Sequence, residues 1–250
     1  DVTYVKPGDH VITCLSVFCG HCNYCLSGHM SLCSTPEIRT PPGPSKRLSW
    51  KGKPLNQILN LSGFAEQMLV HEHALAKIDR EMPMDKAALI GCAVLTGYGS
   101  VVHTAQVEVG STVAVIGCGG IGLAVINAAK IAGAGRIIAI DKDPSKLNLA
   151  KLFGATDILD ASAGEVPQKV IEMTKGGVPF SFECIGTKKT AEDCFGMLCP
   201  GGVATIIGMI PFGTKIELHG LDFLRERKIQ GSLMGSNRFR SDMPRLIEFY

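Results

Sequence analysis

Four cysteines are crowded into the segment CGHCNYCLSGHMSLC, which covers residues 19–33. They are Cys19, Cys22, Cys25 and Cys33, with the spacing C-x2-C-x2-C-x7-C. Four thiols this close need a shared partner, and this ligand type and spacing favour a tetrahedral Zn2+ ion. The residues between them bury little apolar surface, so we expect the lobe to depend on its metal for folding. Four protein ligands close the site, which predicts a structural ion and not a catalytic one.

Other interpretations of the quartet remain open beside structural zinc. Two disulfides would suit a small secreted domain, but this chain has 250 residues. An iron–sulfur cluster would prefer C-x2-C-x2-C-x3-C-P, whereas here the fourth cysteine lies farther along and Ser34 follows it. A zinc module that binds nucleic acid would carry a basic stripe, which does not accompany these cysteines.

The composition narrows the class of protein. The net charge is +2 at neutral pH, so no strong field points to nucleic acid or to an acidic membrane as a partner. Glycine is abundant at 29 residues and aromatic residues make up 6%, a balance that suits an α/β protein with tight turns. Ten cysteines with an evident thiolate cluster indicate a reducing compartment, and we expect the protein to be cytoplasmic.

Strand-like and helix-like runs alternate after about residue 93. Continuous apolar strands between helices predict a parallel sheet with both faces covered, the doubly wound α/β class. The expected strands are 112–117, 136–141, 157–160, 180–186, 203–208 and 229–235, and the expected helices are 120–132, one from Pro144, 164–175 and 188–198. Residues 1–92 are irregular and β-rich, with a strand at His10–Thr13, a hairpin around Trp50–Lys53, a strand at Phe64–Val70 and a helix opening at Pro83–Leu89.

The uncharged stretch 110–129, GSTVAVIGCGGIGLAVINAA, has the length of a membrane helix. Its central glycines interrupt such a helix, so it predicts a buried strand, a glycine turn and a buried helix. The sequence starts at Asp1 in a run toward a strand and stops in a helical pattern at Leu246–Tyr250. We therefore expect a fragment of a longer protein.

The turn in this stretch contains G-x-G-x-x-G as Gly117, Gly119 and Gly122, with a strand before it and a helix starting near Gly120. In that context the motif predicts dinucleotide binding. The first glycine allows the tight turn, the second lets the backbone approach a pyrophosphate, and the third lets helix and strand pack closely. The helix N-terminus offers free N–H groups to the phosphates.

Asp141 ends the next strand, nineteen residues after Gly122. An acid at this place is expected to bind the adenosine-ribose hydroxyls and to repel a 2′-phosphate, which predicts NAD over NADP. Lys142 tempers this preference because a neighbouring cation would favour the phosphate. A structural strand–helix turn and a solvated strand end remain the alternatives for the glycines and for Asp141.

The quartet, the segment GCAVLTGYGSVV (91–102), the GCGGIG turn and the segment IIAIDKDPSK (137–146) together resemble the zinc-dependent medium-chain alcohol dehydrogenases. The segment RLSWKGKP (47–54) resembles the subgroup of liver-type and glutathione-dependent formaldehyde dehydrogenases. The resemblance implies a partial GroES-like catalytic domain at 1–93 with the zinc lobe at 19–33, a Rossmann domain at 94–233, and the start of a return to the catalytic domain at 234–250.

The same resemblance implies the sites. The structural zinc falls on the quartet, and Cys92 matches one ligand of the catalytic zinc. Thr96 matches a residue against the nicotinamide and Lys146 one that reaches the adenosine ribose. Ile121, Ile185 and Ile207 match positions lining the cofactor cleft. The segment 228–235 resembles the edge strand through which subunits pair, so we expect a homodimer or homotetramer.

The implied activity is reversible hydride transfer from an alcohol, or from a hydroxymethyl-thiol adduct, to NAD+. The alternatives are a non-catalytic NAD-binding module and a zinc-independent enzyme like quinone reductase, which lacks the cysteine lobe. The family's other catalytic-zinc ligands lie upstream of Asp1, so we expect the chain as given to be inactive. Arg39 and the 34–47 loop are candidates for binding an anionic substrate group.

Overall fold

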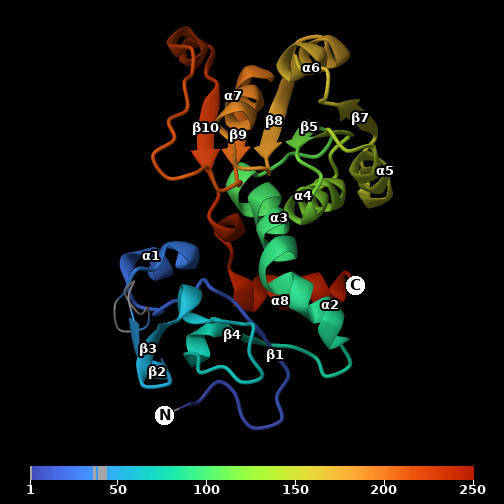
Figure 1. Cartoon of the computed structure of the whole chain (residues 1–250). Helices are drawn as coiled ribbons and strands as arrows, with labels where there is room; N and C mark the ends of the chain where they lie inside the picture. Colours follow the sequence, from blue (N-terminus) through green and yellow to red (C-terminus); the bar gives the residue numbers. More distant parts are fainter. Residues whose placement is uncertain (1, 36–37, 39–43) are drawn as a thin grey trace. The chain divides into compact units, whose positions relative to one another are not determined.

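The computed structural model describes residues 2–35, 38 and 44–250, and the chain divides into two compact units (Figure 1). The first unit comprises Asp1–Leu95 with Ser236–Tyr250, and the second comprises Thr96–Gly235. A six-stranded sheet forms the centre of the second unit. The described part of the first unit contains two antiparallel strand pairs.

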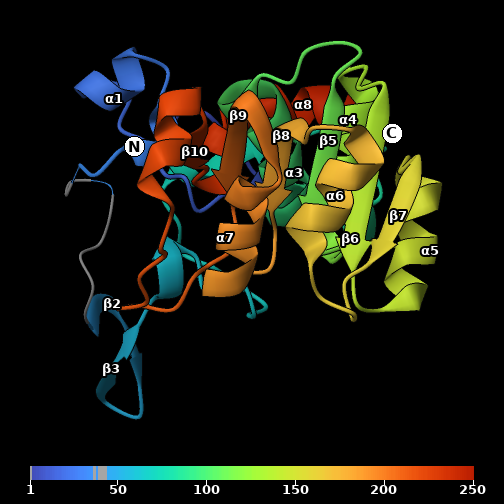
Figure 2. The ribbon, with the colours of Figure 1, turned by 90° about the horizontal axis from the view of Figure 1, so that it is seen from above.

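The sheet of the second unit is parallel throughout. Its strands are β5 (Thr112–Ile116), β6 (Arg136–Asp141), β7 (Asp157–Asp160), β8 (Val178–Glu183), β9 (Leu198–Ile206) and β10 (Lys228–Gly231). Figure 2 shows them side by side in the hydrogen-bonded order β10-β9-β8-β5-β6-β7. The order reverses direction between β5 and β8, which is the doubly wound topology of dinucleotide-binding folds. The predicted fold class is confirmed.

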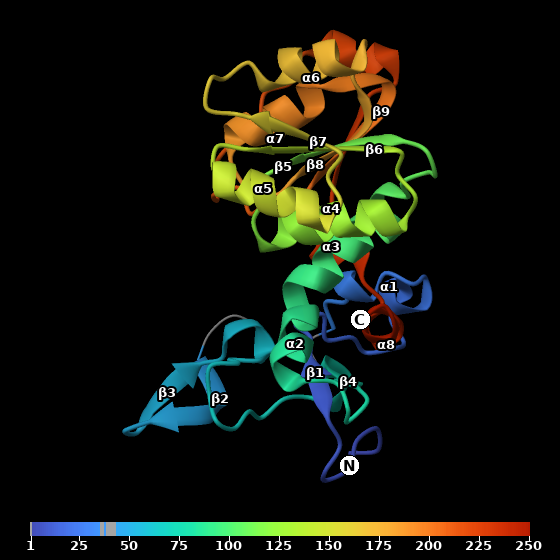
Figure 3. The ribbon, with the colours of Figure 1, turned by 90° about the vertical axis from the view of Figure 1, so that its right-hand side faces the viewer.

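Helices cover both faces of this sheet (Figure 3). They are α4 (Gly120–Ile131) and α5 (Pro144–Phe153) on one face, and α6 (Val166–Thr174) and α7 (Lys188–Gly196) on the other. Strands β5 and β6 are buried along almost their whole length, which explains why their sequences are continuously apolar. Ile116, Ile140 and Phe195 belong to the core between the sheet and α6 and α7.

Strand β9 begins five residues before the predicted start. The predicted helix 188–198 ends at Gly196, and the chain enters the strand at Leu198. Pro200, Gly201 and Gly202 are typical of a turn, yet they lie within the strand, where the register with β8 is irregular. The local sequence of these three residues favours a turn, but pairing with β8 makes the segment a strand.

The first unit holds shorter elements. They are β1 (Val11–Thr13), α1 (Asn23–Leu26), η1 (Met30–Leu32), β2 (Pro44–Trp50), β3 (Lys53–Asn56), η2 (Ile58–Asn60), η3 (Glu72–Ala74), β4 (Leu75–Lys77), α2 (Met84–Leu89), η4 (Ile90–Val94) and α8 (Phe239–Glu248). The hairpin β2–β3 and strand β1 agree with the predictions. The predicted strand at Phe64–Val70 is wrong, because this segment forms bends and Phe64 is fully exposed.

The stretch 110–129 folds as the predicted strand, turn and helix. A different helical run, Met84–Ala105, has 22 residues and a mean hydropathy of 1.4 in its most apolar window, half of which is buried. It consists of α2, η4, α3 (Leu95–Gly99) and η5 (Ser100–Ala105). By length and composition it meets the requirement for a membrane span, which is weak evidence because core helices of globular proteins meet it too.

Candidate cofactor cavity and zinc lobe

The four quartet sulfurs converge in the loop after β1, where all of them lie within 4.8 Å of one another. The Sγ–Sγ distances are 3.8 Å for Cys19–Cys25, 3.5 Å for Cys22–Cys25 and 3.9 Å for Cys22–Cys33. These distances are too long for disulfides. They match the edge of about 3.8 Å of a tetrahedron whose metal–sulfur bonds are about 2.3 Å, the value for zinc thiolates.

The surroundings of the sulfurs favour thiolates. The Cys19 Sγ accepts hydrogen bonds from the His21 and Cys22 amides at 3.4 and 3.2 Å and from the Thr35 hydroxyl at 3.2 Å. Burial opposes ionisation of Cys19, but these bonds outweigh it and lower its pKa to about 5. Burial raises the pKa of the Cys25 thiol to about 12, and hydrogen bonds with neighbouring sulfurs add to the rise.

One cluster thus contains a thiol that ionises readily and another that resists ionisation. Hydrogen bonds from amides and a hydroxyl favour the Cys19 thiolate, whereas burial disfavours the Cys25 thiolate. A divalent cation at the centre would stabilise all four negative charges. The residues therefore fit a structural zinc ion. Within the described ranges, the quartet is the only group of three or more His, Cys, Asp and Glu side chains placed to share a metal.

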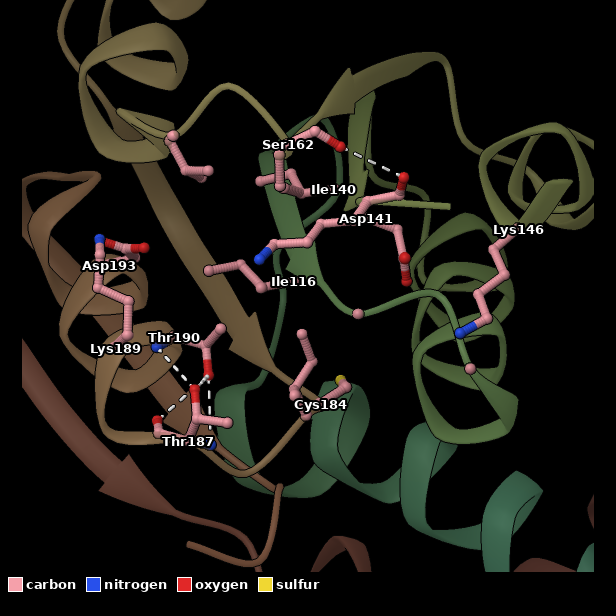
Figure 4. Close-up of a pocket in the computed structure, with 17 residues that line it drawn as sticks. Ile116, Ile140, Asp141, Lys146, Ser162, Cys184, Thr187, Lys189, Thr190 and Asp193 are labelled. Atoms are coloured by element: carbon pink, nitrogen blue, oxygen red, sulfur yellow. Dashed lines mark hydrogen bonds and ion pairs between the residues drawn. The ribbon is translucent and has the colours of Figure 1, made fainter. Parts of the chain in front are cut away.

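A cavity of about 610 Å³ opens in the second unit at the carboxyl ends of the parallel strands (Figure 4). It lies at the switch point between β5 and β8, where doubly wound sheets bind their ligands. The ends of strands and the segments after them line it: Ile116, Gly117 and Gly119 at the end of β5; Ile140, Asp141, Lys142 and Lys146 at the end of β6; Ala161, Ser162, Gly164 and Val166 after β7; and Cys184, Ile185, Thr187, Lys189, Thr190 and Asp193 after β8.

The three motif glycines meet three different steric demands. Gly117 has a φ of +94°, and a Cβ there would lie 2.5 Å from the Ile185 side chain. A Cβ on Gly122 would lie 1.7 Å from the Gly117 carbonyl oxygen, so α4 approaches β5 only because this residue has no side chain. A Cβ on Gly119 would meet nothing within 4 Å. Gly119 therefore faces space that the protein leaves open.

The Asp141 carboxylate is fixed at the end of β6. Its Oδ2 accepts a hydrogen bond from the Cys118 amide at 2.7 Å, and its Oδ1 accepts one from the Asp143 amide at 3.0 Å. These bonds tie the strand end to the glycine turn and leave further lone pairs of both oxygens available. Figure 4 shows Asp141 and Lys146 on one side of the cavity and Thr187 and Thr190 on the other.

The cavity brings together five of the residues singled out for the cofactor: Gly117, Gly119, Asp141, Lys146 and Ile185. It does not include four others, namely Gly120, Ile121, Gly122 and Ile207. The first three of these four lie in the first turn of α4, and Ile207 follows β9. Cys184 also lines the cavity, and burial of its thiol raises the pKa of that group.

The two residues predicted for the catalytic centre lie on one helical run. Cys92 is exposed and lies in η4, a π-helical segment, a feature that is frequent at functional sites. Thr96 is buried, and its hydroxyl donates to the Met234 Sδ at 3.5 Å. Cys92 belongs to no described cluster of three metal ligands, so the described residues alone do not form a catalytic metal site.

Comparisons with known proteins agree with this geometry. Residues 120–250 match the family model described as zinc-binding dehydrogenase, and residues 1–80 match the alcohol dehydrogenase GroES-like domain. The chain belongs to the zinc-binding alcohol dehydrogenase family. It is 39% identical to alcohol dehydrogenase class-3 of Oryza sativa subsp. japonica, over 100% of this chain and 68% of that protein.

Two further relatives support the assignment. The chain is 40% identical to S-(hydroxymethyl)glutathione dehydrogenase of Photobacterium damsela subsp. piscicida, over 99% of this chain and 69% of that protein. Among solved structures, benzyl alcohol dehydrogenase from Acinetobacter calcoaceticus superposes with a TM-score of 0.90 at 28% identity, over 100% of this chain and 69% of that one. The family is one of oxidoreductases.

Several residues that line the cavity of this dehydrogenase were not predicted from the sequence. Thr187, Lys189 and Thr190 line the cavity from the start of α7, and Ser162 lines it after β7. A usable signal was present, because the loops after all parallel strands converge at one edge of the sheet. Thr187 and Thr190 also have the spacing of a helix N-cap and its third residue, and the structure has that capping box.

Replacing one quartet cysteine should remove the lobe's zinc. We expect Cys33→Ser to lower the zinc content by about one ion per chain, since a hydroxyl is a poor substitute for a buried thiolate ligand. Metal analysis of the purified protein measures this. Cys199→Ser, outside the lobe, is the matched control and should keep the wild-type zinc content. Full zinc content in Cys33→Ser would contradict the assignment.

Alanine substitutions at Gly119 and Gly122 of the motif should differ in their effects on stability. Gly122→Ala forces a methyl group into the Gly117 carbonyl, so we expect a loss of about 3 kcal/mol or more in unfolding free energy. Gly119→Ala should leave that free energy within about 0.5 kcal/mol of wild type. Urea unfolding measures both. The affinity for NADH should nonetheless fall in Gly119→Ala, because the added methyl group occupies space proposed for the cofactor. Equal losses of unfolding free energy in the two variants would refute the steric argument.

Proposed function

We propose that this dehydrogenase catalyses reversible hydride transfer between an alcohol, or a hydroxymethyl-thiol adduct, and NAD+, with an aldehyde, ketone or thioester-level product. The observation that carries the proposal is the cavity at the β5–β8 switch point, with the glycine turn on one side and Asp141 at the end of β6. NAD+, when bound, supplies the carbon that accepts the hydride. The chain's own residues bind and orient it.

The cofactor-binding roles follow from position. Gly117 and Gly119 give the pyrophosphate access to the backbone, and the free amides at the start of α4, from Gly120 to Gly122, donate to it. Asp141 accepts hydrogen bonds from the adenosine-ribose hydroxyls and Lys146 reaches the same ribose. Ile185 provides an apolar wall of the cavity. Ile121 and Ile207 lie outside the cavity lining, and we propose that they contact the part of the cofactor that extends beyond it.

The choice of NAD over NADP rests on charge. Asp141 carries a carboxylate whose two oxygens are held by backbone amides, so it is fixed where it can repel a 2′-phosphate. Lys142 and Lys146 also line the cavity and oppose this preference in part. We propose that Asp141 dominates because its side chain is anchored at both oxygens.

At the catalytic centre we propose Cys92 as one ligand of a zinc ion and Thr96 as a residue on the nicotinamide side. When bound, this zinc supplies Lewis-acid polarisation of the substrate oxygen. Ligands beyond Cys92 are required, and the described residues do not group them around it. This observation favours a second candidate, a non-catalytic NAD-binding module. The cysteine lobe argues against the zinc-independent quinone reductase alternative.

The substrate proposal is a thiol adduct of an aldehyde. The relative from Photobacterium damsela subsp. piscicida, named for S-(hydroxymethyl)glutathione, is 40% identical over 99% of this chain. An adduct of this kind carries anionic groups that need a cationic partner. The candidate Arg39 lies outside the described residues, and of the 34–47 loop only 34, 35, 38 and 44–47 lie within them.

The domain limits and setting complete the proposal. We assign 1–93 to a partial GroES-like catalytic domain, 94–233 to the Rossmann domain and 234–250 to the start of the return. We propose pairing of subunits at β10, which is hydrogen-bonded to β9 and lies at the edge of the described sheet. We propose a cytoplasmic location because a thiolate cluster such as the quartet requires a reducing compartment.

Removing the Asp141 charge should shift cofactor preference. We expect Asp141→Asn, which keeps a hydrogen-bonding side chain, to raise kcat/KM for NADP+ relative to NAD+ by about tenfold, or about 1.4 kcal/mol. Initial rates with both cofactors measure the ratio. Asp143→Asn removes an equal charge two residues away, outside the cavity lining, and should leave the ratio unchanged. An unmoved ratio in Asp141→Asn would eliminate its proposed role.

The substrate class is tested by NADH formation. With the complete protein we expect kcat/KM for formaldehyde mixed with glutathione to exceed that for benzyl alcohol by about tenfold or more, as for a site that pairs buried polar groups with its substrate. A preference for benzyl alcohol would place the protein among simple alcohol dehydrogenases. NADH binding without turnover of either substrate would favour the non-catalytic module.

A further inference from the structure

A buried carboxylate that the proposed cofactor contacts do not use lies at the carboxyl end of β8. The side chain of Glu183 is wholly buried. Its Oε1 accepts three hydrogen bonds, from the amides of Ile185 at 2.9 Å and Gly186 at 2.7 Å and from the Thr190 hydroxyl at 2.7 Å. Two of these three donors, Ile185 and Thr190, belong to residues that line the cofactor cavity.

The hydrogen bonds continue from Thr190 into the first turn of α7. Thr190 Oγ1 accepts from the Thr187 amide at 3.3 Å, and the Thr187 hydroxyl accepts from the Thr190 amide at 3.2 Å. Thr187 caps the helix and also lines the cavity. Oε1 of Glu183 therefore holds Ile185 and Thr190 directly, and Thr187 through Thr190, on the β8 side of the cavity.

The backbone of Glu183 holds a third segment. Its carbonyl oxygen accepts hydrogen bonds from the amides of Ile207 at 2.9 Å and Gly208 at 3.1 Å, just after β9. A Cβ on Gly208 would lie 2.4 Å from Glu183 Oε2 and 2.1 Å from the Gly186 nitrogen. The segments after β8 and β9 thus meet at this side chain without room for another carbon atom.

The two carboxylate oxygens are used unequally. Oε2 is buried and has no hydrogen-bond partner among the described atoms, whereas Oε1 has three donors. An unpartnered buried acceptor lowers stability, so an apolar side chain would suit this position better if packing alone mattered. Only a hydrogen-bond acceptor at this place can bind the donors of Ile185, Gly186 and Thr190.

We propose that Glu183 is a positioning residue for the nicotinamide dinucleotide: its Oε1 holds the segment 184–190 as the wall of the cavity that faces Asp141. The inference rests on the proposed function, because it assigns the cavity to that cofactor. The required property is an acceptor oxygen in a fixed place, and the negative charge is secondary. A neutral side chain of the same shape with one such oxygen should therefore serve.

The test compares NADH dissociation constants, measured by fluorescence titration, of wild type, Glu183→Gln and Glu183→Leu in the full-length protein. Glutamine keeps an acceptor oxygen, so its dissociation constant should stay within about threefold of wild type. Leucine fills similar space without an acceptor, and its dissociation constant should rise by about tenfold or more, since displacement of a positioning group by about 1 Å has effects of at least that size.

Ser181 provides a matched control on the same strand. It is wholly buried, and its hydroxyl donates to the Cys194 carbonyl at 2.7 Å without touching the segment 184–190. Ser181→Ala should lower the unfolding temperature yet leave the NADH dissociation constant unchanged. If Glu183→Leu does not fold, Gly208→Ala serves instead: its methyl group would displace the carboxylate and Gly186 while leaving every hydrogen-bonding group present, and it should weaken NADH binding.

The outcomes separate the two levels of the argument. Failure of the wild-type protein to bind NADH overturns the proposed function and, with it, this inference. Tight binding by wild type together with an unchanged dissociation constant in folded Glu183→Leu, or in Gly208→Ala, overturns the positioning role alone. Weak binding by Glu183→Gln equal to that of Glu183→Leu also overturns it, because the acceptor oxygen would then not be the property that matters.

Discussion

The approach of helix α4 to the end of strand β5 is the contact on which the rest of the second unit depends. A Cβ on Gly122 would lie 1.7 Å from the Gly117 carbonyl oxygen, so backbone meets backbone at this point. The contact places the first turn of α4 at the carboxyl end of β5, where the strand order changes direction. The amides of that turn therefore open toward the same space as the loops after β6 and β8.

The two sides of the cofactor cavity are fixed by opposite means. On the β5 side, the missing side chains of Gly117 and Gly122 let main chain pack on main chain. On the β8 side, the buried side chain of Glu183 gathers backbone and hydroxyl donors to one oxygen. Asp141 connects the glycine turn to β6 by accepting from Cys118 and Asp143. Walls that are held in place before a ligand binds reduce the entropic cost of ordering them on binding, and both arrangements provide this.

Local sequence was sufficient where the determinant is local. Strand β6 begins and ends as predicted, because Arg136–Asp141 is an apolar run between a glycine and a proline-led helix. The motif glycines and Asp141 were also accessible, since strand, turn and helix follow one another directly in the chain. The start of β9 was not, because Pro200, Gly201 and Gly202 favour a turn and only pairing with β8 makes them strand. Phe64–Val70 shows the converse, because its alternating pattern forms bends and no strand.

The roles of Thr187, Thr190 and Glu183 were not accessible from the sequence for the same reason. A glutamate inside an apolar strand such as FSFECIG predicts only that burying its carboxylate is unfavourable. The hydrogen-bond donors that compensate for this burial come from the turn after the strand, and only the folded structure shows them. Sequence spacing therefore predicted Gly117, Gly119 and Asp141, which line the cavity. The groups that hold the cavity wall in place depend on tertiary hydrogen bonds.

The zinc lobe and the parallel sheet differ in the interactions that stabilise them. Its short helix α1 buries none of its four residues, whereas β5 and β6 are buried along almost their whole length. Burial raises the pKa of the Cys25 thiol to about 12, which opposes its ionisation in the absence of a cation. We propose that metal binding supplies in the lobe the favourable free energy that packing supplies elsewhere. Zinc activity and proton competition for the thiolates would then set the order of the lobe, whereas apolar burial sets the order of the parallel sheet.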